Sequence, residues 1–196
     1  MAYCDRPIVL ASASTRRREL LGRFDIPFRV IPARGEETAP AGLSPGELVR
    51  ALAEHKAAEV AAGEPESVIV AADTGVEIDG EILGKPGTPE RAAEMLRRLS
   101  GRTHRVWTGV CVRQGERVLS AAEETAVRFH PLTEEEIAAY VATGEPMDKA
   151  GAYGYQDRAC LFVERIEGDY FNVMGLPLCK LSEILSDFGI GLFDRG

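Results

Sequence analysis

The chain has 196 residues, of which 45% are hydrophobic and 28% are charged. A chain of this length and composition normally forms one globular domain or two tightly packed lobes, which excludes fibrous and disordered proteins. The formal net charge of −8 disfavours broad binding to nucleic acid or to an anionic membrane. No apolar run approaches membrane-spanning length and no signal-peptide pattern is present, so we expect a cytoplasmic protein with one domain over residues 1–196.

Cysteine and histidine give no sign of a metal or thiol site. The four cysteines are widely separated, and the three histidines stand alone in the sequence. Zinc sites and redox motifs need closely spaced pairs of these residues. We therefore expect reduced, mostly structural thiols and no catalytic histidine.

The first predicted elements are a strand and a helix joined by a polar turn. Pro7 to Ala11 predicts a buried strand, and Thr15 to Arg23 predicts a helix. The junction holds Ser12, Arg16 and Arg17, whose hydroxyl and guanidinium groups suit phosphate oxygens near a helix N-terminus. A serine cap followed by solvated arginines would give the same pattern, so both interpretations stay open.

A second helix is strongly marked. The segment Ser44–Glu47 combines a capping serine, a proline and a glutamate in the capping-box arrangement, and the helix should run to about Ala62. Leu48, Leu52 and Lys56 fall on one stripe of it, which we expect to face inward. An inward lysine needs a partner such as a phosphate, although a lysine that extends past the edge of the core would fit equally well.

A carboxylate follows the next predicted strand. Val68 to Ala72 is a continuous apolar run typical of an interior strand, and Asp73 is expected at its carboxyl end, where carboxylates often face a ligand crevice. Glu37, in the preceding polar loop, could provide a second oxygen ligand for Mg²⁺ or Mn²⁺. An Asp that only begins a turn and a solvated loop glutamate are the simpler alternatives.

The remaining elements alternate less regularly. The sequence predicts a hairpin over 76–83, a helix over 88–99, strands over 103–113 and 117–129, a helix from Thr133 to before Gly144, a strand over 160–166 and a helix over 177–188. Because an antiparallel section follows βα units, we expect an α/β fold with a mixed, strongly bent sheet flanked by helices, in two lobes with a central cleft.

Two loops of this region carry further candidates. Lys85 lies in the stiff Gly84–Gly87 loop, where a lone lysine is usually a surface charge. The loop from Gly144 to Asp157 is rich in glycine, tyrosine and charge, and Gln156 could read the edge of a pyrimidine. An ordinary connection with its tyrosines packed on the core has the same composition.

Six ordered segments together resemble the Maf (septum formation inhibitor) family of nucleoside triphosphate pyrophosphatases. They are Leu10–Leu21, Ala71–Thr74, Leu83–Pro86, Leu96–His104, Glu145–Gln156, and Gly168–Tyr170 with Val173–Pro177. The sequence departs from the family pattern at Thr15, where a proline is usual, and at Asp157, where a glycine is usual. The resemblance implies a single domain with the bent-sheet fold of Maf and inosine triphosphatase-like proteins.

The resemblance also implies an activity: hydrolysis of a nucleoside triphosphate between the α and β phosphates, with a divalent cation, Mg²⁺ or Mn²⁺. Asp73 matches the family's proton acceptor. The positions that set base preference fall on Arg16, Thr74 and Gln156, and those that handle phosphate and metal fall on Ser12, Arg17, Glu37, Lys56 and Lys85.

The loop at 147–156 is similar to that of the family branch acting on dTTP and UTP. Three alternatives remain: a preference for 7-methyl-GTP, a preference for modified pyrimidine triphosphates, and a role as a nucleotide-binding regulator of cell division. We expect no nucleic-acid or membrane partner, and a homodimer is common among proteins of this kind.

Overall fold

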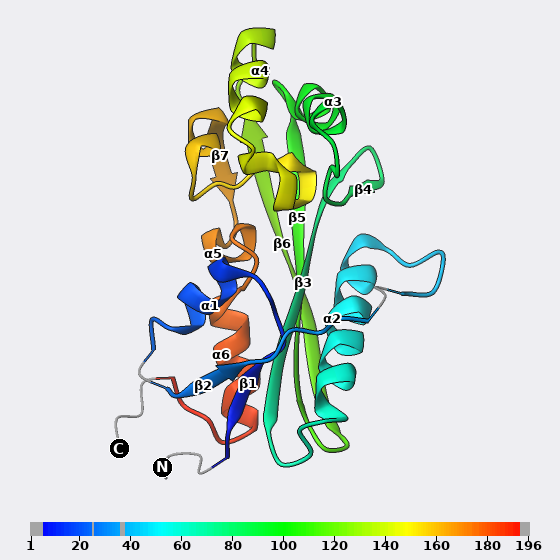
Figure 1. Cartoon of the computed structure of the whole chain (residues 1–196), viewed down its shortest axis with the longest axis vertical. Helices are drawn as coiled ribbons and strands as arrows, with labels where there is room; N and C mark the ends of the chain where they lie inside the picture. Colours follow the sequence, from blue (N-terminus) through cyan, green and yellow to red (C-terminus); the bar gives the residue numbers. More distant parts are fainter. Residues whose placement is uncertain (1–5, 25, 36–37, 193–196) are drawn as a thin grey trace. The chain divides into compact units, whose positions relative to one another are not determined.

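The computed structural model describes residues 6–24, 26–35 and 38–192, and shows a mixed α/β fold with one seven-stranded sheet (Figure 1). The strand order is β2-β1-β3-β5-β6-β7, and β4 pairs with β3. The strands are β1 (Ile8–Leu10), β2 (Phe28–Val30), β3 (Val68–Ile78), β4 (Glu81–Leu83), β5 (Thr103–Gln114), β6 (Arg117–Phe129) and β7 (Val163–Glu167). The predicted fold class, a mixed sheet flanked by helices, is confirmed.

The helices lie between and after these strands. They are α1 (Thr15–Leu21), α2 (Pro45–Ala61), α3 (Pro89–Leu99), α4 (Glu134–Ala142), α5 (Tyr170–Val173) and α6 (Leu178–Asp187), with 3-10 turns η1 (Glu145–Asp148), η2 (Ala150–Ala152) and η3 (Arg158–Phe162). Within the described ranges, every helix is too short or too polar to cross a membrane.

The chain forms two compact units. Unit 1 contains Met1–Asp73, Thr108–Glu123 and Gly175–Gly196, and unit 2 contains Thr74–Trp107 and Glu124–Met174. The boundary between Asp73 and Thr74 falls inside strand β3. Each unit has its own buried apolar cluster.

Unit 1 is built on three parallel strands. Leu10 of β1 is in register with Val30 of β2 and with Val70 of β3. Alternate side chains of β1 and β3 pack with Ala53, Ala57 and other residues of α2, because successive strand residues point to opposite faces. The predicted capping box at the start of α2 is confirmed, with Ser44 N donating to Glu47 Oε2 over 2.9 Å.

Unit 2 packs α3, α4 and the 3-10 turns against strand segments. Its core includes Leu96 and Leu99 of α3, Ile137 of α4, and Phe129 of β6. The predicted capping box of α4 is also confirmed, since Thr133 accepts from the backbone of the third helical residue and its own N–H is bound by the glutamate there.

Two local predictions are wrong. Strand β3 does not end at Asp73: it continues to Ile78 because Val76–Ile78 pairs with β4, so Asp73 lies within the strand. The strand predicted from Cys160 begins only at Val163, because η3 covers the preceding residues. Pairing with the adjacent strand β4 carries β3 past Asp73, and β7 begins where its pairing with β6 begins, at Val163.

Candidate functional site

The polar junction after β1 is held together by its own side chains. Ser14 caps α1 by accepting from the backbone N–H of Arg17, as the simpler interpretation of this segment expects. The guanidinium of Arg17 donates from Nε to the Gly175 carbonyl over 2.7 Å and from Nη1 to the Ser12 hydroxyl over 3.4 Å. Ser12 is buried. The junction therefore contains both an ordinary serine cap and an arginine whose guanidinium is held in place by hydrogen bonds.

Lys56 and Asp73 form an ion pair inside unit 1. Lys56 Nζ donates to Asp73 Oδ1, and the two side chains are only 14% and 13% exposed. The predicted stripe is displaced by one residue, because the buried face of α2 is formed by Val49, Ala53, Ala57 and Val60, whereas Leu48 and Leu52 are only half-buried. Lys56 does turn inward beside this face, and one of its protein partners is the candidate catalytic carboxylate. An ammonium has three donors, so Lys56 could bind a phosphate oxygen while it holds Asp73.

The register of β1 and β3 relates the positions of Ser12 and Asp73. Leu10 pairs with Val70, and the Ala11 amide still donates to the Val70 carbonyl over 2.8 Å. Ser12 lies two residues past the end of β1, and Asp73 lies within β3 three residues after Val70, so both are placed where β1 ends beside β3 in unit 1. This region thus holds a hydroxyl, a guanidinium, an ammonium and a carboxylate.

The other predicted site residues differ in their exposure and in their location. Arg16 is half-buried on α1, and Thr74 is half-buried on β3 as the first residue of unit 2. Lys85 is exposed, but its loop is tied to the glycine-rich loop because the Gly151 amide donates to the Gly84 carbonyl over 3.1 Å. Glu37 lies outside the described residues.

The glycine-rich loop of unit 2 is organised around a buried lysine. Lys149 is 6% exposed, and its Nζ donates to the Glu145 carbonyl over 2.7 Å and to Asp148 Oδ1 over 2.9 Å. The same ammonium lies 3.6 Å from Asp157 Oδ2, which also accepts from Gln156 Nε2 over 3.1 Å. Gln156 is half-buried, so part of its amide stays accessible.

Buried aromatic residues pack against the glycine-rich loop. His104 Nε2 and the Tyr153 hydroxyl share a hydrogen bond of 2.7 Å, and both residues are buried. Burial lowers the pKa of His104 to about 3 and raises the pKa of Tyr153, so both are neutral near pH 7. This pair is structural, as the alternative for the loop tyrosines predicts. Tyr155 instead contacts the partly exposed ring of Tyr170 edge to face.

A metal ion bound at Asp73 would need ligands from the substrate or from water in addition to protein side chains. Within the described ranges, no three His, Cys, Asp or Glu side chains gather closely enough to hold a metal ion. Mg²⁺ at phosphate sites commonly uses one or two carboxylates, with substrate phosphates and water completing its shell. Asp73 offers a carboxylate of this kind, and Glu37, the second expected ligand, lies outside the described residues.

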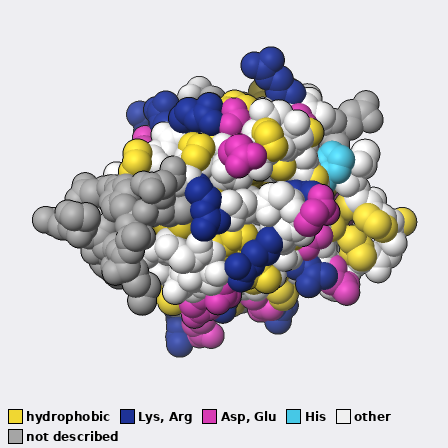
Figure 2. Space-filling model, turned by 90° about the horizontal axis from the view of Figure 1, so that it is seen from below, with side chains coloured by type: hydrophobic (Ala, Val, Ile, Leu, Met, Phe, Trp, Pro, Cys, Tyr) yellow, Lys and Arg dark blue, Asp and Glu magenta, His cyan; other side chains and the backbone are white. Residues whose placement is uncertain are grey.

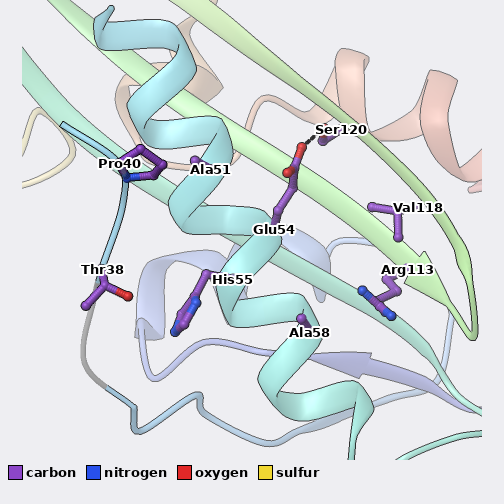
Figure 3. A pocket seen from close by; sticks show the side chains of 9 residues that line it. All are labelled: Thr38, Pro40, Ala51, Glu54, His55, Ala58, Arg113, Val118 and Ser120. Carbon is purple, nitrogen blue, oxygen red and sulfur yellow. Dashed lines mark hydrogen bonds between the residues drawn. The ribbon is translucent and has the colours of Figure 1, made fainter. Parts of the chain in front are cut away.

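A pocket of about 630 Å³ lies elsewhere in unit 1 (Figure 3). It is lined by Thr38, Pro40, Ala51, Glu54, His55, Ala58, Arg113, Val118 and Ser120. Figure 3 shows Glu54 reaching from α2 to Ser120, whose hydroxyl donates to its carboxylate. No predicted site residue that the structure describes lines this pocket. Lys56 is next to the lining residue His55 in sequence, but the two side chains project about 100° apart around the helix.

The sequence assigned no role to three residues that make the contacts above: Gly175, Lys149 and Asp157. The Gly175 carbonyl is a backbone acceptor, which composition cannot reveal. Lys149 and Asp157 lie in the loop that the sequence singled out, but without an assigned role. Asp157 did carry a signal, since it replaces the usual glycine of the resembling family.

Comparisons with known proteins match almost the whole chain. A relative from Moorella thermoacetica, described as a dTTP/UTP pyrophosphatase, is 53% identical over 190 residues, which cover 96% of this chain and 98% of the relative. A relative of the same description from Bacillus velezensis is 49% identical and covers 93% of this chain and 97% of its own.

Solved structures with the same fold are more distant in sequence. The Ham1 protein of Staphylococcus aureus is 14% identical with a TM-score of 0.56, covering 93% of this chain and 100% of that chain. A HAM1 protein from Coxiella burnetii is 18% identical with a TM-score of 0.55, covering 93% and 99% respectively. The model of the family described as Maf-like protein matches residues 7–188, and the chain belongs to this family.

Proposed function

We propose that this chain hydrolyses dTTP and UTP to the nucleoside monophosphate and pyrophosphate. The observation that carries the proposal is the similarity, near 50% identity and over nearly full length, to relatives described as dTTP/UTP pyrophosphatases. The proposed reaction breaks the bond between the α phosphorus and the oxygen that bridges it to the β phosphorus. Water attacks the α phosphorus, and pyrophosphate leaves.

The region of unit 1 where β1 ends beside β3 supplies groups suited to this reaction. Asp73 is proposed to accept the proton of the attacking water, and its ion pair with Lys56 fixes the direction of its carboxylate. Arg17, held by Ser12 and by the Gly175 carbonyl, is proposed to bind phosphate oxygens, as is Ser12. In unit 2, the resemblance assigns Lys85 to the phosphates and Thr74 and Gln156 to the base, and in unit 1 it assigns Arg16 to the base.

A divalent cation completes the proposal. Asp73 and Glu37 would hold Mg²⁺ or Mn²⁺, which would neutralise charge on the phosphates when bound. The arginine and lysine side chains add to this neutralisation at the departing pyrophosphate.

We further propose a cytoplasmic enzyme that acts on free nucleotides. The net charge of −8 supports this, and on the face in Figure 2 Lys and Arg are interspersed with Asp and Glu instead of forming a basic stripe. Size-exclusion chromatography with light scattering would decide whether it forms the homodimer expected from the resemblance.

The direct test is pyrophosphate release from dTTP, UTP, CTP, GTP and 7-methyl-GTP with Mg²⁺ or Mn²⁺. Asp73→Asn should abolish turnover of dTTP and UTP, because an amide cannot accept the proton. Asp79→Asn makes the same chemical change at an exposed turn residue of the hairpin and should leave turnover near wild type.

Three outcomes would contradict parts of the proposal. Full activity of Asp73→Asn would remove Asp73 from the reaction. Turnover of 7-methyl-GTP alone would keep the chemistry and change the base preference. No turnover of any nucleotide would favour a nucleotide-binding regulator.

A further inference from the structure

Asp157 fixes the orientation of the Gln156 side-chain amide. Its Oδ2 accepts from Gln156 Nε2 over 3.1 Å, and it lies 3.6 Å from the ammonium of the buried Lys149. Lys149 is anchored in turn by the Glu145 carbonyl and by Asp148. The carboxylate therefore has a defined position beside Gln156, set by a residue that is 6% exposed.

Only one orientation of that amide is compatible with this neighbour. An ionised carboxylate only accepts hydrogen bonds, and an amide has a donating NH₂ end and an accepting carbonyl end. Turning the Gln156 amide around would place its carbonyl oxygen against the Asp157 carboxylate. That would replace a charge-assisted hydrogen bond with a repulsive contact. Oε1 and the second N–H of Nε2 thus remain for a ligand.

Oε1 and this N–H match the base edge of uracil and thymine and do not match that of cytosine. Uracil and thymine present a donor at N3–H beside the acceptor O4, so Oε1 can accept from N3–H while Nε2 donates to O4. Cytosine presents the reverse, an acceptor at N3 beside a donating 4-amino group. It would need the amide turned around.

We propose that Asp157 is a positioning residue that makes the enzyme prefer uracil and thymine triphosphates over cytosine triphosphates. This rests on the proposed function and on Gln156 as the reader of the base. In this chain the discrimination is set one residue away from the side chain that touches the base.

A purely structural role for Asp157 makes a different prediction. If Asp157 only paired with Lys149 to hold the loop, its replacement would lower activity on all nucleotides equally. Positioning of Gln156 instead changes the ratio of kcat/KM for UTP to that for CTP. Asp157→Asn is the sharpest variant, because a neutral amide of the same size can accept from Gln156 or donate to it and so permits both orientations.

We expect Asp157→Asn to reduce the UTP-to-CTP ratio of kcat/KM about tenfold, the scale of exchanging a charge-assisted hydrogen bond for a neutral one. Most of the change should be a gain on CTP. Asp148→Asn is the matched control, since Asp148 binds the same ammonium, and it should leave the ratio within about twofold of wild type. In a Gln156→Ala background, Asp157→Asn should no longer change the ratio, because Asp157 acts through Gln156.

Binding separates this inference from the proposed hydrolysis. The affinities of wild type and Asp157→Asn for the α,β-methylene analogues of UTP and CTP, measured by calorimetry, require no turnover. A wild-type preference for the UTP analogue that shrinks in Asp157→Asn supports the inference even if no nucleotide is hydrolysed. An unchanged ratio in Asp157→Asn, an equal change in the Gln156→Ala background, or a wild type that binds neither analogue would overturn it.

Discussion

Gly109 marks the point where helix α2 lies directly on strand β5, and Gly109→Ala tests that packing. A Cβ at this position would lie 2.2 Å from the Val49 carbonyl oxygen and 2.5 Å from the Arg50 backbone nitrogen. The first distance is about 1.2 Å short of ordinary contact at 3.4 Å. Both neighbours are helix backbone, so no side chain can rotate away and α2 itself must shift.

The cost should therefore lie at the upper end of the range for overpacking, about 3 kcal/mol in the free energy of unfolding. For a chain of this size that corresponds to a melting temperature lowered by about 6 to 12 °C. Lys56 lies two turns further along the same helix, so the shift should also disturb its ion pair with Asp73 and reduce turnover. Circular dichroism on heating and pyrophosphate release measure the two effects.

Gly63→Ala is the matched control, because its nearest neighbour would be 3.9 Å away, and its melting temperature should stay near that of wild type. If Gly109→Ala melted within about 2 °C of wild type, the close approach of α2 to β5 would be refuted.

Two further predictions concern buried titratable groups. Burial lowers the pKa of His104 from 6.5 to about 3, so the unfolded chain takes up a proton between these pH values that the folded chain does not. The free energy of unfolding should therefore fall by about 1.4 kcal/mol per pH unit from this group as the pH drops below 6.5. Urea denaturation at several pH values should show a shallower loss in His104→Gln, and equal slopes would contradict the prediction. Burial also raises the pKa of Cys111 to about 12, whereas Cys160 and Cys179 are exposed. Mass spectrometry after alkylation at pH 8 should find Cys111 modified only in unfolded protein, and its labelling in the native state at the rate of Cys160 would count against the burial.

Local signals carried much of the fold prediction. The capping boxes that begin α2 and α4 depend on residues three positions apart, and both were predicted from sequence. The hairpin of β3 and β4 was likewise predicted from its Asp-Gly turn, and Ile78 pairs with Glu81 across it. Such contacts are specified by neighbours in the chain.

What was missed depends on how elements pack and pair, which composition does not report. Asp73 was expected at the end of a strand, but the hairpin with β4 extends β3 to Ile78. The sequence predicted that Lys56 turns inward, yet only the packing of α2 against β3 identified Asp73 as a partner. The roles of the predicted site residues remain predictions for the experiments above.

The division of unit 1 into three chain segments has a consequence for its biosynthesis. Its last segment begins at Gly175, and the bond from Arg17 to the Gly175 carbonyl joins residues 158 positions apart. During synthesis on the ribosome, the hydrogen bond from Arg17 to this carbonyl can therefore form only after residue 175 has emerged. Shortened chains that stop before residue 175 should accumulate as incomplete intermediates, and α6 would be the element whose arrival closes the fold.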